Sequence, residues 1–287
     1  MKLLDLIQPS RSRESKNIVV FGAGRSGTTW LAQIIASAGL EFVFEPLNPG
    51  EVPEARVMKP LPLYCRKQDA FEWEALFTRM MNGEVRNSWT IRLNPGAERK
   101  VIKFIRANLL IEWILHNFDV HPVFITRNPL AVVASIKEQG WELKAGWVQN
   151  VLTSPRLNEP FFSTIPEVAE WVSRDLTDAE VKALYWCIHN HVPRSKGLFR
   201  KLHFIRYEEL CQDPEKVFGQ LAPKIGIPMT SSTRSAFSRP SIMRGKRHDE
   251  KGYDPRRAWR DILTPEDVEA VKRIVGAFGL EEFVEEA

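Results

Sequence analysis

The sequence predicts an α/β fold in which a central parallel sheet is flanked by helices in three layers. Short apolar and β-branched runs alternate with helical patterns along the chain, which is typical of a parallel sheet covered on both faces. The 287 residues, 44% of them hydrophobic, can bury a large core and exclude a disordered or fibrous chain. The expected strands are 17–21, 41–44, 101–105, 122–126 and 203–206.

Helical patterns occupy most of the segments between and after these strands. The expected helices are 28–38, 109–117, 130–139, 178–199, 214–225 and 264–277. The last has the clearest start, because Thr264 can cap it, Pro265 suits the first helical position and Asp267 stands three residues after the cap.

The chain has no repeat and no Pro/Ser-rich linker that separates two compositions. Two segments interrupt the alternation of strands and helices: 46–99 is rich in Pro, Met and Trp, and 141–177 contains several prolines and tryptophans. We therefore expect a single domain over 1–287, with insertions at about 46–99 and 141–177.

Composition excludes several classes of protein. The formal net charge of +4 is too small to indicate a nucleic-acid partner, and no apolar stretch reaches the roughly twenty residues of a membrane span. The first residues lack the apolar run of a signal peptide. Cys65, Cys187 and Cys211 are odd in number and widely spaced, which argues against a disulfide framework or a cysteine zinc site. We expect a soluble, cytoplasmic protein with no nucleic-acid or membrane partner.

A glycine-rich turn between the first strand and the first helix predicts an anion site. Gly22, Gly27 and Thr29 have the P-loop spacing, but Thr28 replaces the lysine that would reach the β- and γ-phosphates. Arg25 supplies a cation two residues before Gly27. The strand 122–126 ends in Arg127 rather than in a magnesium-binding carboxylate. The pattern predicts a P-loop-like fold that binds a nucleotide without a transferable γ-phosphate.

A second anion site is expected at the end of the strand 122–126. Arg127 stands where ligands of open α/β sheets bind, Asn128 can cap the following helix and Pro129 suits its first turn. Ser135 lies two helical turns further on, so both side chains can share one phosphate only if the ligand lies along the start of that helix.

Both segments resemble motifs of sulfotransferases that use 3′-phosphoadenosine 5′-phosphosulfate (PAPS). RSGTTWL is similar to their 5′-phosphosulfate loop, and RNPxxxxxS to their 3′-phosphate signature. The first resemblance implies that the residues of the loop bind the phosphosulfate and that the tryptophan after it stacks on adenine; these are Arg25, Ser26, Gly27, Thr28, Thr29 and Trp30. The second implies that Arg127 and Ser135 bind the 3′-phosphate.

Two segments further along the chain extend the resemblance. FIRYEELCQDP is similar to the family's strand whose tyrosine reaches adenine, which implies that role for Tyr207. GKRHDEKGYDPRRAW resembles, with altered spacing, the basic loop and tryptophan that close over the 3′-phosphate. Arg247 and Lys251 are its candidate cations, with Lys246 as a rival. Residues 234–260 carry nine Lys or Arg against three acids, a local charge of +6 that suits a multiply charged anion.

The resemblance also implies a general base. EFVFEPLNP is similar to the Tyr-Glu-Pro-Leu and Phe-Glu-Pro-Leu segments of carbohydrate-type and bacterial sulfotransferases, so Glu45 is the expected base, acting with Arg25 at the phosphosulfate. The alternative is a structural role for Glu45, in which its carboxylate pairs with Arg25 or caps a turn. His189, His191 and His248 are rival bases. Lys103 and Arg106 either line the acceptor site or solvate the edge of the sheet.

The resulting hypothesis is an enzyme that moves the sulfuryl group of PAPS to a hydroxyl of a carbohydrate, glycolipid or related metabolite. In-line transfer requires positioning, charge stabilisation and a base, and we expect no metal requirement. One alternative is a P-loop-type nucleotide kinase or phosphotransferase, and another is a non-catalytic nucleotide-binding module. The identity of the acceptor and the oligomeric state stay open at this point.

Overall fold

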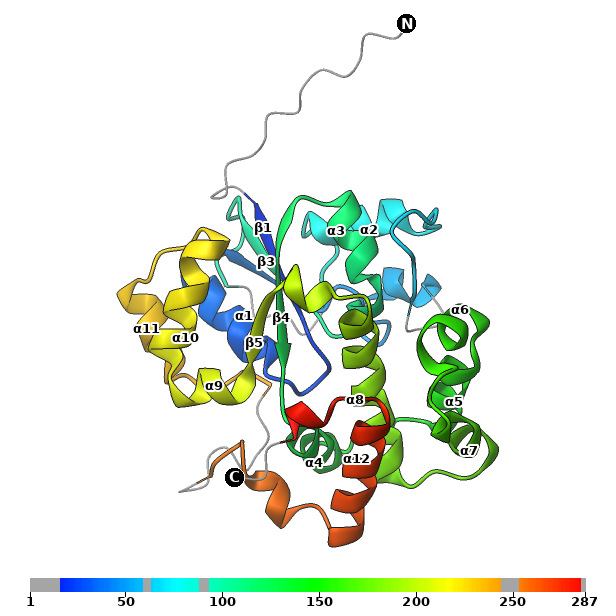
Figure 1. Cartoon of the computed structure of the whole chain (residues 1–287). Helices are drawn as coiled ribbons and strands as arrows, with labels where there is room; N and C mark the ends of the chain where they lie inside the picture. The colour runs from blue at the N-terminus through cyan, green and yellow to red at the C-terminus, as the bar shows by residue number, and fades with distance from the viewer. Residues whose placement is uncertain (1–15, 59–62, 88–92, 244–252, 285–287) are drawn as a thin grey trace, which may run out of the picture.

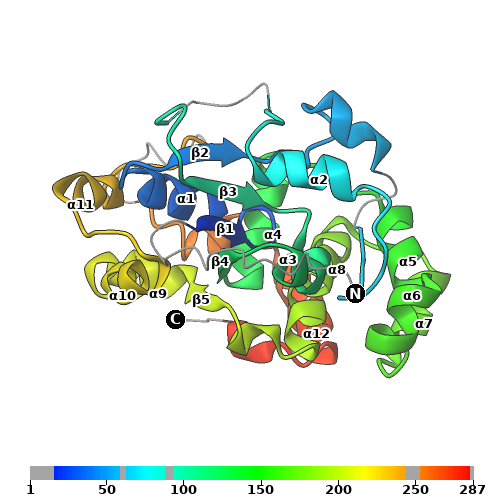
Figure 2. The same ribbon diagram turned by 90° about the horizontal axis from the view of Figure 1, so that it is seen from above.

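A computed structural model describes residues 16–58, 63–87, 93–243 and 253–284. Its centre is a parallel sheet whose five described strands run in the order β2-β3-β1-β4-β5 (Figure 2). Their bounds are β1 (Asn17–Phe21), β2 (Glu41–Phe44), β3 (Lys100–Phe104), β4 (Val120–Thr126) and β5 (His203–Arg206). Val19 of β1 pairs with Ile102 on one side and Pro122 on the other. The expected α/β fold with a central parallel sheet is confirmed.

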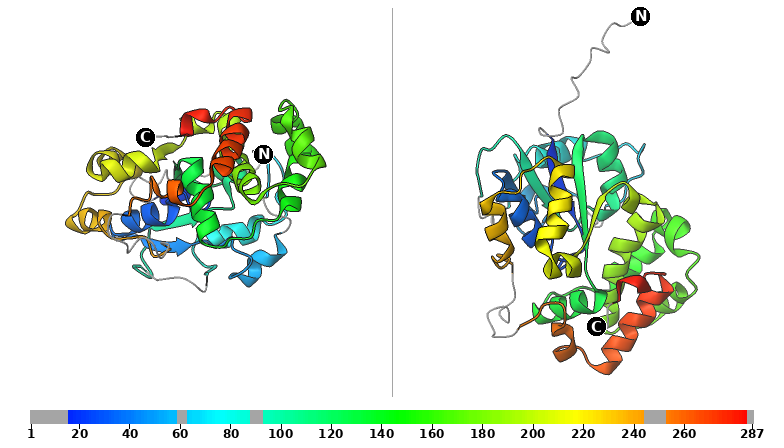
Figure 3. Two further views of the ribbon diagram at one scale, coloured as in Figure 1. Left: turned by 90° about the horizontal axis from the view of Figure 1, so that it is seen from below. Right: turned by 60° about the vertical axis from the view of Figure 1, so that its left-hand side comes forward.

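Alternate residues of the strands face opposite layers of helices, because side chains of a strand alternate between the two faces of a sheet. Ile18 and Val20 of β1 pack in a cluster with α1 (Thr28–Ala36), whereas Val19 and Phe21 pack in a cluster with α3 (Ile111–Asn117). The helices therefore cover both faces, and Figures 1 and 3 show the sheet between these layers.

On the face of α1 the layer is completed by α9 (Tyr207–Gln212), α10 (Pro214–Leu221), η6 (Ala222–Ile225) and α11 (Ser231–Phe237). On the face of α3 it includes η2 (Pro53–Val57), α2 (Glu74–Met81) and η3 (Asn108–Leu110). The segment 46–99, expected as an insertion, thus contributes η2 and α2 to this layer.

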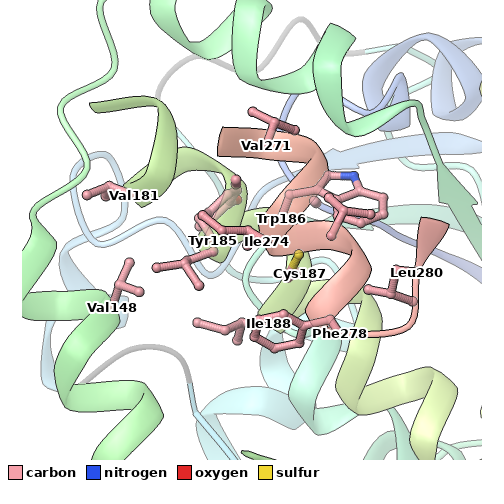
Figure 4. Packing of buried hydrophobic residues seen from close by; sticks show 14 of the residues in the cluster. Val148, Val181, Tyr185, Trp186, Cys187, Ile188, Val271, Ile274, Phe278 and Leu280 are labelled. Carbon is pink, nitrogen blue, oxygen red and sulfur yellow. The ribbon is translucent and has the colours of Figure 1, made fainter. Parts of the chain in front are cut away.

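A third cluster of buried side chains surrounds the long helix α8 (Asp178–Ser195), which begins with a Thr177–Glu180 capping box. Figure 4 shows residues of α8, including Trp186 and Ile188, close to Ile274 and Phe278. The remaining described elements are α4 (Pro129–Glu138), α5 (Ala145–Thr153), α6 (Pro155–Leu157), η4 (Asn158–Phe162), α7 (Glu167–Ser173), η5 (Leu198–Arg200), η8 (Ala258–Asp261), α12 (Pro265–Ala277) and η9 (Glu281–Phe283).

The expected elements are found, with differences at several ends. The start of α12 is confirmed, including the Thr264–Asp267 capping box. The helix expected over 178–199 ends at Ser195, because Gly197 adopts a left-handed φ of 64°. The helix expected over 214–225 changes to a 3-10 turn at Ala222, where Pro223 supplies no backbone N–H. The helix expected over 28–38 ends at Ala36, before Gly39. The strand expected over 101–105 begins and ends one residue earlier.

None of the helices in the described ranges is both long enough and apolar enough to cross a membrane.

Candidate functional site

A cavity of about 780 Å³ opens at the carboxyl edge of the sheet. The helices that follow β1 and β3 cover opposite faces, so the chain diverges there and leaves a crevice, as in other open α/β sheets. Most of the residues expected in the site line this cavity: Arg25, Gly27, Thr28, Thr29, Trp30, Glu45, Arg127 and Tyr207. Ser26 and Ser135 lie next to it, in contact with its walls. Arg247, Lys251, Lys246 and His248 fall outside the described residues.

The loop between β1 and α1 presents backbone N–H groups to the cavity in addition to the side chain of Arg25. Gly27 precedes α1 in a left-handed conformation with a φ of 89°, no side chain caps the helix, and its first turn has no acid. A Cβ at Gly27 would lie 2.4 Å from Cδ2 of Tyr207, so only glycine fits. An uncapped helix start with N–H groups directed at a cavity is a site for an anion.

Two side chains from distant segments hold this loop in place. Gly22 N–H donates to Asn108 Oδ1 at 3.1 Å, and Gly24 N–H donates to Tyr185 Oη at 3.0 Å. Neither Asn108 nor Tyr185 was expected in the site, and nothing in the local sequence marks them. Each of the two hydrogen bonds joins residues that lie far apart in the chain, 86 residues for Gly22 and Asn108 and 161 residues for Gly24 and Tyr185.

The second expected site is built at the end of β4. Asn128 caps α4 by accepting a hydrogen bond from Leu130 N–H at 3.0 Å, with Pro129 at the first helical position, as expected. The carbonyl of Arg127 accepts from Trp186 Nε1 at 3.1 Å, which fixes the backbone there. The Arg127 guanidinium lies 4.6 Å from the Tyr207 ring. Its Nε is buried and has no hydrogen-bond partner among the described residues.

Arg25 connects the two expected sites. Its Nε donates to Ser135 Oγ at 3.0 Å, its Nη1 donates to the carbonyl of Met243 at 2.7 Å, and its own carbonyl accepts from Arg127 Nη1 at 3.0 Å. Burial, and then the charge of Arg127, lower the pKa of Arg25 to about 10. The guanidinium groups of Arg25 and Arg127 both lie at one wall of the cavity, and a bound anion there would reduce the repulsion between their positive charges.

Glu45 lies at the end of β2, held by two cations. Its Oε1 is 2.9 Å from Lys103 Nζ, and its Oε2 is 3.2 Å from Arg106 Nη1. Glu45 has a left-handed φ of 42°, which is uncommon for a residue with a side chain and concentrates at functional sites. Burial lowers the pKa of Lys103, whose Nζ lies 4.3 Å from the Phe44 ring centroid. Lys103 and Arg106 thus line the cavity, and Glu45 is paired with them rather than with Arg25.

The sequence matches the model of the sulfotransferase domain over residues 15–249, which is most of the chain. The chain belongs to the sulfotransferase family. It is therefore a sulfotransferase enzyme that catalyses sulfuryl transfer, in a family that uses PAPS. No curated protein matches the sequence significantly.

Solved structures of sulfotransferases resemble this one remotely. The sulfotransferase domain from the curacin biosynthetic pathway is 15% identical, with 93% of this chain and 99% of that chain covered and a TM-score of 0.48. The sulfotransferase domain of the Synechococcus PCC 7002 olefin synthase is 16% identical, with 94% and 98% covered and a TM-score of 0.48. Mouse SULT7A1, complexed with PAP, is 13% identical, with 94% and 89% covered and a TM-score of 0.46. At these values the similarity assigns no role to any residue.

Two aromatic side chains, Trp30 and Tyr207, also line the sulfotransferase cavity. The rings of Trp30 and Tyr207 meet edge to face, with centroids 5.9 Å apart. Tyr207 shares a hydrogen bond with Cys211, and burial raises the pKa of the Tyr207 hydroxyl and raises the pKa of Cys211 to about 11. Both groups are therefore neutral at physiological pH, and Trp30 and Tyr207 offer flat aromatic surfaces to a planar ring.

His189 and His191, the two rival bases that the structure describes, are poorly placed to act as bases in this sulfotransferase. His189 is buried, its Nδ1 lies 3.1 Å from Asn108 Nδ2, and burial lowers its pKa to about 3. His191 has each ring nitrogen 3.1 Å from a backbone carbonyl, of Phe278 and of Phe161, and burial lowers its pKa as well. Neither faces the large cavity.

Among the described residues no group of three or more His, Cys, Asp or Glu side chains is arranged to hold a metal ion. That sulfuryl transfer by this chain needs no metal stays a prediction.

Proposed function

We propose that this sulfotransferase transfers the sulfuryl group of PAPS to a hydroxyl of a carbohydrate, glycolipid or related metabolite, with Glu45 as the base. One observation carries the proposal: Arg25, Arg127 and the uncapped start of α1 converge on one cavity that Trp30 and Tyr207 also line. A small nucleotide with two separate anionic groups has complementary charge and shape.

The chain's own groups fit such a ligand. Ser26 Oγ and Arg127 Nε are buried without a hydrogen-bond partner among the described residues, and burial and the neighbouring charge of Arg127 lower the pKa of Arg25. We assign the 5′-phosphosulfate to Arg25 and the loop Ser26–Thr29, and the 3′-phosphate to Arg127 and Ser135. Adenine is assigned to Trp30 and Tyr207. The basic residues Arg247 and Lys251 stay part of this proposal from the sequence alone.

Glu45 is proposed to take the acceptor's proton. In the transfer, the acceptor oxygen forms a bond to sulfur, the bond between sulfur and the 5′-phosphate oxygen breaks, and the hydroxyl proton passes to the carboxylate. The ion pairs with Lys103 and Arg106 fix the position of Glu45 at the cavity wall. Lys103 and Arg25 lie on the same cavity and can stabilise negative charge on the departing phosphate.

Glu45→Gln tests the assignment of the base. We expect sulfate transfer to fall by about 100-fold or more, because the amide cannot accept the proton, while affinity for 3′-phosphoadenosine 5′-phosphate (PAP) changes less than about twofold. Transfer is measured with labelled PAPS and an acceptor panel, and binding by calorimetry.

Glu41→Gln is the matched control. Glu41 is also buried and paired with an arginine and a lysine, Arg86 and Lys100, but at the opposite end of β2. Loss of a buried ion pair alone would therefore affect both variants, whereas loss of the base affects only Glu45→Gln. Full transfer by the Glu45 variant would refute its role as the base.

A further inference from the structure

A second cavity of about 350 Å³ adjoins the first at the carboxyl edge of the sheet. The two share Ile105, Arg106 and Trp141 as a common wall. Because Arg106 donates to Glu45 Oε2 at 3.2 Å, this wall stands next to the proposed base. A molecule in the second cavity can therefore reach across Arg106 towards the carboxylate.

The buried side of the second cavity is aromatic and uncharged. Tyr185 and His189, both on α8, are buried with ring centroids 4.6 Å apart, and Trp147 on α5 lies 6.0 Å from Tyr185. The pKa of about 3 leaves His189 neutral. Of the charged lining residues, Glu142 and Lys144 are exposed and form the rim, and Arg106 belongs to the wall shared with the first cavity, where it is paired with Glu45. Most of the contact surface offered to a ligand is therefore apolar.

The polar atoms on this side are largely occupied by the protein. Tyr185 Oη accepts from Gly24 N–H. Asn108 uses its Oδ1 for Gly22 N–H, so its Nδ2 faces His189 Nδ1 as a donor. A neutral His189 then keeps only its Nε2–H to donate. A free sugar ring buried here would lose more hydrogen bonds to water than these groups can return.

Trp141 separates the two cavities and packs against the loop between β1 and α1. Its indole lies 5.9 Å from the Arg25 guanidinium, and a Cβ at Gly24 would approach Trp141 Cζ3 to 2.7 Å. The wall between the proposed donor site and the second cavity is thus an aromatic side chain packed on the loop itself. A ligand in the second cavity has this indole and Trp147 to contact.

We propose that the second cavity binds an apolar ring or chain that adjoins the reacting hydroxyl, so that the acceptor is an amphiphilic alcohol rather than a free oligosaccharide. The position of the reacting hydroxyl rests on the proposed function, whereas the binding of an apolar group rests on the cavity itself. Among the acceptor classes proposed above, this favours a glycolipid-type molecule.

The test compares phenyl β-D-glucopyranoside with methyl β-D-glucopyranoside, which differ only in the apolar group. Binding of each to the protein saturated with PAP is measured by calorimetry. We expect the phenyl glucoside to bind at least about tenfold more tightly, because a buried ring removes apolar surface from water. Trp147→Ala should reduce this preference to about threefold or less while PAP affinity changes less than about twofold.

Trp73→Ala is the control, since Trp73 is also half-buried but packs against the cluster on the α3 face of the sheet. The inference is overturned if the two glucosides bind equally, if neither binds, or if Trp147→Ala leaves the preference unchanged.

A transfer assay with labelled PAPS distinguishes failure of this inference from failure of the proposed function. Binding of the phenyl glucoside without transfer to it or to a panel of amphiphilic alcohols would refute the proposed function alone. Equal binding of the glucosides, with sulfate transferred to both, would refute this inference alone.

Discussion

Two strand–loop–helix units, β1–α1 and β4–α4, end at the same cavity but present different groups to it. The start of α1 has no side-chain cap, no acid in its first turn and a left-handed glycine before it. The start of α4 is capped by Asn128 and carries Pro129, so at its first two positions Pro129 has no N–H and the Leu130 N–H is bonded to Asn128. The first unit offers backbone N–H groups together with the side chain of Arg25, and the second offers only side chains, those of Arg127 and Ser135.

This difference shows how two strand–loop–helix units of one sheet can bind two anionic groups by different means. A backbone site depends on the conformation of the loop, so a substitution there changes both folding and binding. A side-chain site depends on charge and hydrogen-bonding groups on a helix that is already complete, so substitutions there should change binding with little effect on stability. The following changes separate these two cases, in order of expected effect.

Gly27→Ala should have the largest effect, because it requires a left-handed alanine and a Cβ within 2.4 Å of Tyr207. We expect a loss of about 2–4 kcal/mol in the free energy of unfolding and about 100-fold or more in PAP affinity. Chemical denaturation and calorimetry measure the two. Gly276→Ala, in α12 with open space around it, should stabilise slightly and leave PAP affinity unchanged. Normal PAP binding by Gly27→Ala would contradict a backbone anion site.

Arg127→Ala should lower PAP affinity more than stability, although it also removes the hydrogen bonds from the guanidinium to the carbonyls of Arg25 and Pro255. We expect PAP affinity to fall by about 100-fold, because a buried charge partner of the phosphate is lost, while affinity for AMP changes less than about threefold. Titration calorimetry with both nucleotides gives the ratio. Arg257→Ala, an exposed change in the same basic region of the sequence, is the control. If the unaltered protein does not prefer PAP over AMP, the assignment of the 3′-phosphate to this unit is wrong.

Ser135→Ala should have a smaller effect of the same kind. The variant removes one hydroxyl that bonds Arg25 Nε at 3.0 Å, so PAP affinity should drop by about three- to tenfold. Competition with a fluorescent nucleotide would detect this change. Ser195→Ala, at the exposed end of α8, removes a similar hydroxyl away from the cavity. An equal loss in both variants would exclude a specific role for Ser135.

Asn128→Ala should have the smallest effect on binding and a clear effect on stability. It removes the cap of α4 and should cost about 1 kcal/mol in the free energy of unfolding, with PAP affinity within about twofold. Thermal unfolding with and without PAP measures both quantities. A loss of PAP affinity much larger than twofold would mean that the second unit also depends on its helix terminus, and the contrast between the two units would disappear.

The sequence predicted the local features of both units well. The cap at Asn128, the proline at 129 and the glycine turn before α1 are confirmed, and the strands at 17–21, 41–44 and 203–206 have the expected bounds. These features follow from hydrophobic periodicity and capping chemistry, which act over a few residues. The predicted ends of α8 and α10 are wrong. Gly197 ends the first helix and Pro223 changes the second to a 3-10 turn, although both residues lie within apolar patterns.

What the sequence determined by itself was the kind of site: a parallel sheet, two anion motifs and a carboxylate after the second strand. The tertiary structure alone decided which groups meet. It paired Glu45 with Lys103 and Arg106, turned Arg25 towards Ser135, and brought Asn108 and Tyr185 to the loop that follows β1. The physical reason is that short-range preferences are encoded in neighbouring residues, whereas these contacts join segments tens to more than a hundred residues apart, and only the packing of helices on the sheet fixes them.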